Sequence, residues 1–489
     1  MEWIWGTWFL VAVLTVCWYR HRSVKNKIYE RRGVPKGSSG WPLIGETLDF
    51  IACGYTSRPV SFMDKRKHLY GKVFKTHILG TPIIVSTDPD VNKVVLQNHG
   101  NTFIPAYPKS ITELLGQNSI LQTNGYLQKR LHALIGGFLR SPQFKARITK
   151  DIENSVKLTL ACWKGMHVIH IQEEIRKITF EVLVKMLITI GPGGDLDNIK
   201  RDFEEFIKGL ICVPIKLPGT RLYKSLKAKE RLLKKVERIV QERKLSIEES
   251  DGNGTPNDAL DVLLYDNGEP NEKQCLPMDF ICGNIIEMMI PGEETVPTAM
   301  TLAIKFLSDS PVALKQLMVE NLELKRQKAD SGDDYGWTDY MSLSFTQNVI
   351  SETLRLANII NGVWRKAVKD VEIKGEPCCH LIPQGWCVLA SFISVHMDED
   401  NYEDPYEFNP WRWEKTGAAV NNTCFTPFGG GQRLCPGLEL SRLEISIFLH
   451  HFVTTYSWIA EKDEIVSFPT VKMKRKLPIK VTPLGATVI

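Results

Sequence analysis

The sequence predicts a mainly helical protein with a minor β-sheet, built as a single large domain behind an N-terminal membrane anchor. Apolar residues recur at helical spacing through most of the chain, short β-branched runs occur near its start, and an uncharged apolar run occupies residues 3–19. With 489 residues, 43% of them hydrophobic and 24% charged, the chain can bury a large core.

The expected anchor is the run WIWGTWFLVAVLTVCWY, residues 3–19. As a helix it would span roughly 25 Å at about 1.5 Å per residue, which is close to the thickness of a thin bilayer. Basic residues follow the run, beginning with Arg20 and Arg22, whereas only Glu2 precedes it. Because cationic residues resist translocation, we expect a single-pass signal anchor with the body in the cytosol; a cleaved signal peptide is the disfavoured alternative.

Three regions are expected along the chain. Residues 1–20 form the anchor helix, residues 21–46 form a basic hinge rich in proline and glycine, and residues 47–489 form the main domain. In the main domain, β-branched runs after Gly71 predict a small sheet. Apolar periodicity predicts helices over residues 151–161, 171–190, 196–210, 222–249, 278–307, 311–328 and 345–357.

Charge and cysteine usage exclude several classes of protein. The net charge of +5 is mild, and the basic stretch over residues 223–245 carries apolar residues at helical spacing. We therefore expect a solvated helix face and no nucleic-acid partner, with anionic lipid or an acidic protein as the alternative. The eleven cysteines are scattered, which argues against a disulfide framework. Cys378 and Cys379 are adjacent, which is poor geometry for a metal, so we expect a long loop over residues 374–386.

A first candidate cluster combines one carboxylate with two arginines. Glu352 and Arg355 stand three residues apart in QNVISETLRL and therefore share a helix face. Exposed pairs at this spacing are common and contribute little. Arg412 lies among aromatic residues in FNPWRW, where a buried arginine must find a carboxylate and an exposed one would stack at the surface.

The stretch FTPFGGGQRLCPGLEL, residues 425–440, places Cys435 after three glycines and an arginine. Four interpretations compete: a structural thiol, a zinc or disulfide cysteine, a dinucleotide-binding loop, and a thiolate that ligates a metal cofactor. A structural zinc would need further ligands at defined spacings. A dinucleotide-binding loop would need a preceding strand in a first βα turn, and this stretch lies near the end of a helical chain.

The fourth interpretation accounts for the neighbours of Cys435. Pro436 suits the first position of a helix, which would place Cys435 at a helix N-terminus, where free amides and the dipole favour a thiolate. The glycines, Gly429 among them, would let the backbone pack against a flat macrocycle, and Arg433 could neutralise an anionic substituent. A haem with a cysteine ligand fits this pattern.

These residues resemble the haem-binding signature of the cytochrome P450 monooxygenases, F-x-x-G-x-R-x-C-x-G. Its fixed positions are filled by Phe428, Gly431, Arg433, Cys435 and Gly437. The cluster described above matches the family's E-x-x-R helix, in Glu352 and Arg355, and the arginine that closes its buried triad, in Arg412. The resemblance covers essentially the whole chain. It implies the cytochrome P450 fold, a haem-thiolate monooxygenase domain over residues 47–489, and haem b ligated by the Cys435 thiolate.

The resemblance also implies neighbours for the haem. Two arginines match positions that bind haem propionates and two residues lie in the cofactor loop: Arg433, Arg365, Phe428 and Gly429. In GYLQKRLHALIGGFL, Gln128 and His132 occupy the two places of the family's W-x-x-x-R pattern. We name Lys129 and His132 as candidate cofactor partners in this helix.

Two prolines should interrupt the long helix expected over residues 278–307. Pro291 and Pro297 cannot donate backbone hydrogen bonds, so the helix should kink between them. Glu294 and Thr295 lie there and match the family's A/G-G-x-D/E-T segment, although Pro291 replaces its usual small residue. The resemblance implies that Thr295 organises a water at the oxygen site and that Glu294 relays protons from solvent. An ordinary polar helix turn is the alternative.

The overall resemblance extends to the plant brassinosteroid-biosynthetic monooxygenases, and most closely to those that hydroxylate the steroid side chain at C-23. It implies O2 as oxidant, electrons from NADPH through NADPH-cytochrome P450 reductase, a hydrophobic steroid of the 3-epi-6-deoxocathasterone type as substrate, and the lipid of the endoplasmic reticulum membrane around the anchor. Hydroxylation of another position, or of another plant sterol or a diterpenoid, is the alternative. A haem-thiolate isomerase is a further one.

Overall fold

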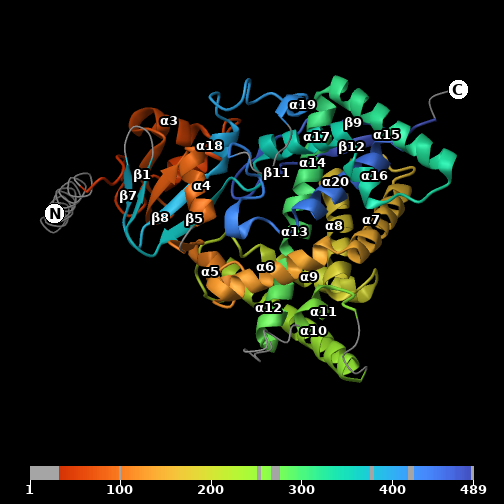
Figure 1. Ribbon diagram of the computed structural model, residues 1–489, viewed down its shortest axis with the longest axis horizontal. Helices are drawn as coiled ribbons and strands as arrows, with labels where there is room; N and C mark the ends of the chain where they lie inside the picture. Colours follow the sequence, from red (N-terminus) through yellow and green to blue (C-terminus); the bar gives the residue numbers. More distant parts are fainter. Residues whose placement is uncertain are drawn as a thin grey trace, which may run out of the picture.

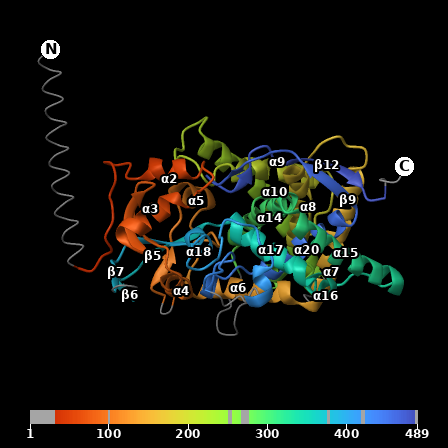
Figure 2. The same ribbon diagram turned by 90° about the horizontal axis from the view of Figure 1, so that it is seen from above.

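The computed structural model of the protein describes residues 32–98, 101–249, 255–265, 276–374, 379–416 and 423–485. A part that contains the largest sheet lies beside a larger helical part (Figure 1, Figure 2). The predicted mainly helical fold with a minor sheet is therefore confirmed. Within the described ranges no helix is long and apolar enough to cross a membrane, and the anchor expected at residues 3–19 lies outside them.

The largest sheet among the described residues has five strands in the order β1-β2-β8-β5-β3. The bounds are β1 Val73–Ile78, β2 Thr81–Ser86, β3 Phe103–Pro105, β5 Gly362–Ala367 and β8 Cys387–Ser391. β2 and β8 run parallel, with Ile83 opposite Cys387, and the other neighbours run antiparallel. The strands predicted after Gly71 are present, and the sheet is completed by strands from much later in the chain.

Short helices border this sheet, and smaller sheets lie elsewhere. The bordering helices are α2 Thr47–Cys53, α3 Ser61–Tyr70, α4 Pro89–Gln97 and α18 Phe392–His396. The smaller sheets pair β4 Ile169–His170 and β9 Tyr456–Ala460 with β12 Pro478–Pro483, β6 Val371–Ile373 with β7 His380–Ile382, and β10 Ile465–Val466 with β11 Lys472–Met473. Strands β6 and β7 pair with each other and flank the first part of the long loop expected over residues 374–386. Cys378 lies outside the described residues.

The larger part of the protein is helical. Its helices are α5 Lys109–Leu115, α6 Gly125–Arg140, α7 Pro142–Cys162, α8 Ile171–Ile188, α9 Gly194–Ile207, α10 Arg221–Glu249, α11 Ala259–Leu264, α15 Pro311–Ser331, α16 Trp337–Met341, α17 Ser344–Ala357, α19 Arg412–Thr416 and α20 Leu438–Val453, with the segments described next. The predicted helices are all present. α7 begins well before its predicted start because Ser141 caps it: the Ser141 side chain accepts a hydrogen bond from the Phe144 amide, and Pro142 occupies the first turn.

The long helix expected over residues 278–307 is divided into α12 Met278–Met288, α13 Ile290–Glu293 and α14 Thr295–Asp309. The second break falls at Glu294, whose φ of −114° and ψ of −56° depart from helical geometry. Pro297 lies in the first turn of α14, where a missing backbone N–H costs no helical hydrogen bond. The predicted interruption is confirmed.

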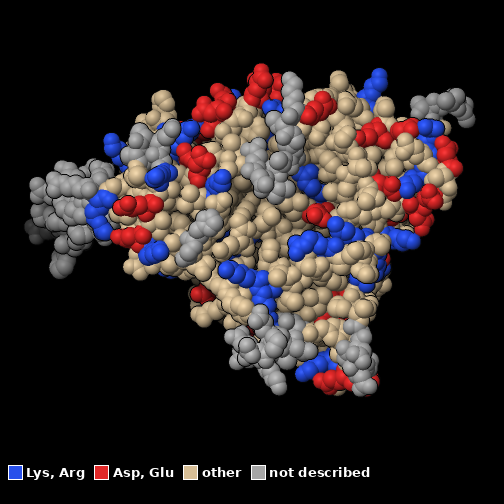
Figure 3. All heavy atoms as spheres, in the orientation of Figure 1, with Lys and Arg blue, Asp and Glu red and all other residues tan. Residues whose placement is uncertain are grey.

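Helix α10 carries the basic stretch and is amphipathic. Its buried side chains are Leu222, Ser225, Ala228, Leu232, Val236 and Val240. Beside this buried face, Arg231 and Lys235 each place a nitrogen 2.7 Å from a carboxylate oxygen of Asp202 on α9. Charges of both signs are interspersed over the face shown in Figure 3. The stretch is therefore a solvated helix face, as expected.

Helix α20 contains a buried carboxyl group whose Oε1 atom has no hydrogen-bond partner among the described residues. Glu444 is only 6% exposed, and burial raises its pKa to about 8. Residues of α20 otherwise belong to the main hydrophobic core, which it shares with α7, α14 and α17. A charge at this position is unfavourable because burial removes the water that would solvate it.

We expect Glu444→Gln to stabilise the protein more at about pH 9 than at about pH 5. A carboxyl group with a raised folded pKa favours folding below its unfolded pKa, near 4.5, and this contribution is lost as the pH rises through about 8. Above that pH the buried carboxylate lowers the free energy of unfolding by about 1.4 kcal/mol for each unit of pKa shift. Glutamine carries no charge and therefore avoids this loss. Thermal midpoints at the two pH values measure the effect, and equal shifts at both would contradict it.

Candidate active site

The fully buried carboxylate of Glu352, on α17, lies at the centre of a polar cluster. Arg355 Nε and Nη2 donate to it at 2.9 and 2.8 Å, and Arg412 Nε donates at 3.0 Å. The Trp413 indole and the Asn409 amide each donate at 3.0 Å. The three residues expected together thus do lie together, and five donors from two segments far apart in sequence compensate one buried charge.

The same cluster holds the approach to the cysteine loop. Arg355 Nη1 donates to the carbonyl oxygens of His396, at 2.8 Å, and Pro405, at 2.7 Å. The His396 Nε2 atom accepts a hydrogen bond from the Thr426 amide at 3.0 Å. Burial and the nearby Arg355 charge lower the pKa of His396 to about 3, so the ring is neutral and can accept this bond. A continuous path of contacts therefore connects Glu352 to the start of the loop.

The cysteine loop is shaped by two glycines with positive φ. Gly429 has φ +73° and Gly431 has φ +63°, and the Cys435 amide donates to the Phe428 carbonyl oxygen at 3.1 Å. A Cβ atom on Gly431 would lie 2.1 Å from the Leu96 carbonyl oxygen, at the end of α4. Glycine is therefore required at position 431 by close packing on α4 and by the positive φ. The close approach of a flat macrocycle to the loop glycines stays a prediction.

The helix after Cys435 begins later than the sequence predicted. Pro436 and Gly437 form a turn, and α20 starts at Leu438. The surroundings of Cys435 raise the pKa of its thiol through loss of solvation, and the Gly437 amide opposes this by donating a hydrogen bond to it. A free amide next to Cys435 thus favours a negative sulfur, as expected, although burial of the thiol has the larger effect in the opposite direction. A positively charged metal ion at the sulfur would reverse the balance.

Two arginines lie near the cysteine loop without an acidic partner. Burial lowers the pKa of Arg365 and Arg433, to about 10 for Arg433, and their mutual repulsion adds to the effect at Arg433. Within the described residues neither guanidinium forms an ion pair with a carboxylate. Tyr107 accepts a hydrogen bond from Arg365. Arg433 donates its hydrogen bonds to neutral oxygens of residues 121–124, so the two positive charges are available to balance an anionic group.

The expected distal residues lie at the break between α13 and α14. Thr295 Oγ1 donates to the Pro291 carbonyl oxygen at 3.3 Å, and its oxygen can still accept a hydrogen bond. Loss of solvation raises the pKa of Glu294, while the charges of Arg176 and Lys472 act in the opposite direction. The adjacent Glu293 is buried, and its pKa is raised to about 7. Both acids can therefore hold a proton more readily than exposed glutamates.

A family model described as cytochrome P450 matches residues 35–483. The chain belongs to the cytochrome P450 family. It is accordingly a cytochrome P450 monooxygenase, and the family implies a haem-thiolate cofactor.

Curated relatives and a solved structure extend this result. The chain is 68% identical, over 95% of its length and 89% of the relative, to a 3-epi-6-deoxocathasterone 23-monooxygenase of Arabidopsis thaliana. A second Arabidopsis thaliana enzyme with the same description is 52% identical over 91% of the chain and 89% of the relative. The structure of retinoic acid-bound cyanobacterial CYP120A1 has a TM-score of 0.78 and 25% identity, covering 92% of this chain and 99% of that one. The cytochrome P450 fold is thus established.

The residues at the cysteine loop fit the haem of a cytochrome P450. Cys435 supplies a thiol that a metal cation would help to ionise, Gly429 keeps the loop free of a side chain, and Arg433 and Arg365 offer two positive charges to two propionates. Phe428 packs half-buried against the main core at the start of the loop.

Helix α6 places its expected residues on different sides. His132 Nε2 lies 2.7 Å from the Leu434 carbonyl oxygen, and Gln128 Nε2 donates to the Gln432 carbonyl oxygen at 3.0 Å. Lys129 is exposed. Gln128 and His132 thus support the loop through its backbone, and the role predicted for Lys129 stays a prediction.

Two contributors near the haem loop were missed by sequence reasoning. Tyr107 interacts with both arginines although it lies in the loop before α5, and Gln128 holds the cysteine loop although it is uncharged. Of the two, only Gln128 could have been found from the sequence, because it occupies the first place of the family's W-x-x-x-R pattern.

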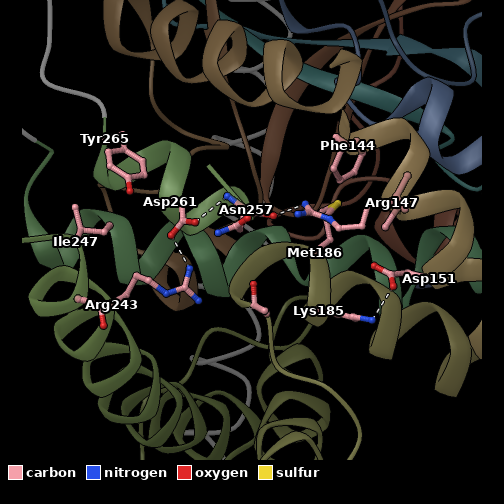
Figure 4. A pocket seen from close by; sticks show the side chains of 13 residues that line it. Phe144, Arg147, Asp151, Lys185, Met186, Arg243, Ile247, Asn257, Asp261 and Tyr265 are labelled. Atoms are coloured by element: carbon pink, nitrogen blue, oxygen red, sulfur yellow. Dashed lines mark hydrogen bonds and ion pairs between the residues drawn. The ribbon is translucent and has the colours of Figure 1, made fainter. Parts of the chain in front are cut away.

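A separate polar cavity of about 360 Å³ lies between α7, α8, α10 and α11 (Figure 4). Four of its charged side chains are paired: Lys185 with Asp151 at 2.7 Å, and Arg243 with Asp261 at 2.5 Å. A fifth, Arg147, donates to the Asn257 carbonyl oxygen. None of its lining residues comes from the cysteine loop or from α12–α14. It is therefore distinct from the candidate active site.

We expect Gly431→Ala to displace the cysteine loop from α4 and to lower the thermal midpoint and the yield of haem-loaded protein. The added carbon would meet backbone atoms that cannot move aside, and the positive φ adds strain. Gly80→Ala is the matched control, because Gly80 also has a positive φ, +75°, but faces open space. Equal losses in the two variants, measured by thermal unfolding and the reduced carbon monoxide spectrum, would contradict the packing argument.

Proposed function

We propose that this chain hydroxylates the side chain of a brassinosteroid precursor at C-23, with O2 and with electrons from NADPH delivered by NADPH-cytochrome P450 reductase. The observation that carries the proposal is the 68% identity, over 95% of the chain, to an Arabidopsis thaliana 3-epi-6-deoxocathasterone 23-monooxygenase. The substrate would be a hydrophobic steroid of that type.

Haem b would bind with its iron on the Cys435 sulfur and its propionates near Arg433 and Arg365. When bound, it would activate O2 and insert one oxygen atom into a C–H bond of the steroid. The Gly437 amide hydrogen bond would moderate the charge on the sulfur, and Glu352, Arg355 and Arg412 would keep the surrounding loop rigid.

Proton delivery would be the task of Glu294 and Thr295. Thr295 would hold a water at the helix break, through the oxygen that still accepts hydrogen bonds. Glu294, with its raised pKa, would pick up a proton more readily than an exposed glutamate, and the neighbouring cations Arg176 and Lys472 would favour its release. Protons would thereby reach the oxygen site through these two side chains.

The body is proposed to lie on the cytosolic face of the endoplasmic reticulum membrane, held by the anchor over residues 1–20 and the hinge over residues 21–46. The basic residues that follow the apolar run support this orientation. The link between α9 and α10 adds an apolar surface that a membrane could cover, because Ile211, Val213, Ile215 and Leu217 are all exposed.

Thr295→Ala should uncouple electron use from hydroxylation. Without the hydroxyl group, the water that carries protons is lost, and the yield of product per NADPH should fall by at least about tenfold. Thr301→Ala is the control, because the Thr301 hydroxyl makes the same kind of bond on α14, to the Pro297 carbonyl oxygen at 2.7 Å. Unchanged coupling in Thr295→Ala would remove Thr295 from the mechanism.

The substrate is tested by incubating microsomes that contain this chain and a plant reductase with C-22-hydroxylated sterols, followed by product analysis. We expect a product hydroxylated at C-23, and none from the Cys435→Ala protein, which should also lack the red-shifted Soret band of the reduced carbon monoxide complex. Oxidation at another carbon, or turnover of diterpenoids alone, would overturn the steroid C-23 assignment. A product formed without O2 would indicate an isomerase.

A further inference from the structure

One short segment, residues 116–124 between α5 and α6, touches both sides of the candidate active site. We call it the strap. Its N-terminal half is bound to α12, whose continuation carries Glu294 and Thr295, and its C-terminal half is bound to Arg433 of the cysteine loop. The strap therefore joins the two elements between which the haem would lie.

The α12 end of the strap is held by two buried polar side chains. Asn284 and Glu287 lie three residues apart and share a helix face. Asn284 Oδ1 accepts the Ile120 amide at 2.7 Å, and Asn284 Nδ2 donates to the Asn118 carbonyl oxygen at 3.3 Å. Glu287 Oε2 accepts the Ser119 hydroxyl at 2.6 Å. The Leu121 amide donates to Ser119 Oγ at 3.2 Å, so the Ser119 hydroxyl links a turn of the strap to the Glu287 carboxyl group.

The strap also folds on itself and is fixed at its far end. The Ser119 carbonyl oxygen accepts hydrogen bonds from the Thr123 amide, at 2.9 Å, and from the Thr123 hydroxyl, at 2.8 Å. Arg433 donates to the Leu121 carbonyl oxygen at 3.3 Å, to the Thr123 carbonyl oxygen, and to Asn124 Oδ1 at 2.9 Å. The turn around Ser119 is therefore connected by hydrogen bonds to Arg433, which is two residues from Cys435.

A third element, α10, joins the same cluster. Lys229 Nζ donates to the Leu114 and Leu115 carbonyl oxygens at 2.9 and 2.7 Å, which caps the C-terminus of α5 just before the strap. Its charge also acts on the Glu287 carboxyl group. The carboxyl group thus lies where α10, α12 and the strap meet.

We infer that Glu287 and Asn284 are positioning residues that hold the strap over the substrate side of the haem and so set how tightly the substrate binds. The inference deepens the proposed function and rests on it for the identity of the ligand. Neither residue touches the reacting atoms in this arrangement. They act through the turn at Ser119, and loosening that turn should weaken substrate binding much more than it alters the haem ligand.

Hydrogen exchange of the holoenzyme tests the contact independently of any substrate. Burial raises the pKa of Glu287 to about 7, so the experiment is run at about pH 8, where the carboxyl group is mostly ionised. In Glu287→Gln, the isosteric side chain keeps its volume but loses the charge that accepts the Ser119 hydroxyl, so the amides of residues 116–124 should exchange at least about tenfold faster. Ser119→Ala, which leaves the carboxyl group in place, should have the same effect. The double variant should be little worse than either single one, because the residues share one contact.

The matched control is Glu320→Gln. Glu320 on α15 caps backbone amides, those of Phe345 and Thr346 at 2.8 Å each, at the start of α17, away from the strap. This variant should leave exchange at residues 116–124 unchanged. Unaltered exchange in both Glu287→Gln and Ser119→Ala, or an equal change in Glu320→Gln, would overturn the inference.

Substrate affinity is then measured by titrating the ferric holoenzyme with a C-22-hydroxylated sterol and following the shift of its Soret band. We expect the Kd to rise about tenfold in Glu287→Gln and in Ser119→Ala, which corresponds to about 1.4 kcal/mol, and to stay unchanged in Glu320→Gln. An unchanged Kd in the first two variants would refute the role in binding. If the native protein itself shows no sterol-induced shift, the proposed substrate fails, while the exchange experiment still decides whether Glu287 holds the strap.

Discussion

The arrangement around the haem loop depends on one buried charge. The Glu352 carboxylate has no contact with water, so its place in the core is tolerable only with a full set of donors. Those donors come from α17 itself and from the segment over residues 409–413, and Arg355 extends the set to His396 and from there to Thr426. Removing any member would leave charge or donors unpaired inside the protein, which explains why this polar cluster can define a single loop conformation.

A second feature of the candidate active site is the break in the helix between α13 and α14. The break at Glu294 places a threonine and two acids with weakened acidity on a bend between α13 and α14. In a continuous helix, the side-chain hydroxyl and carboxyl groups would point outward along the surface. The backbone carbonyl groups would all be occupied by backbone amides. The bend thus combines local backbone irregularity with polar side chains in an otherwise apolar region, as is common at functional sites.

Local patterns revealed much of this fold, and long-range contacts account for most of what they missed. Apolar periodicity located the helices, and the spacing around Cys435 and Glu352 identified the polar residues that the structure brings together. Tyr107 and the Ser119–Glu287 contact depend on pairing across 168 residues or more, for which one sequence carries no periodic signal. The late start of α20 and the packing of Gly431 on α4 were missed for a related reason, because neighbouring segments decide both.

The parallel pairing of β2 with β8 has a consequence for biosynthesis. About 300 residues separate the two strands, so at about 5–20 residues per second the ribosome needs roughly 15–60 s after β2 to produce its partner. During that interval the β1–β2 hairpin presents an open edge of unpaired backbone groups, a surface on which nascent chains aggregate. Protection of this edge by a chaperone until β8 emerges would therefore be a requirement for efficient production of the protein.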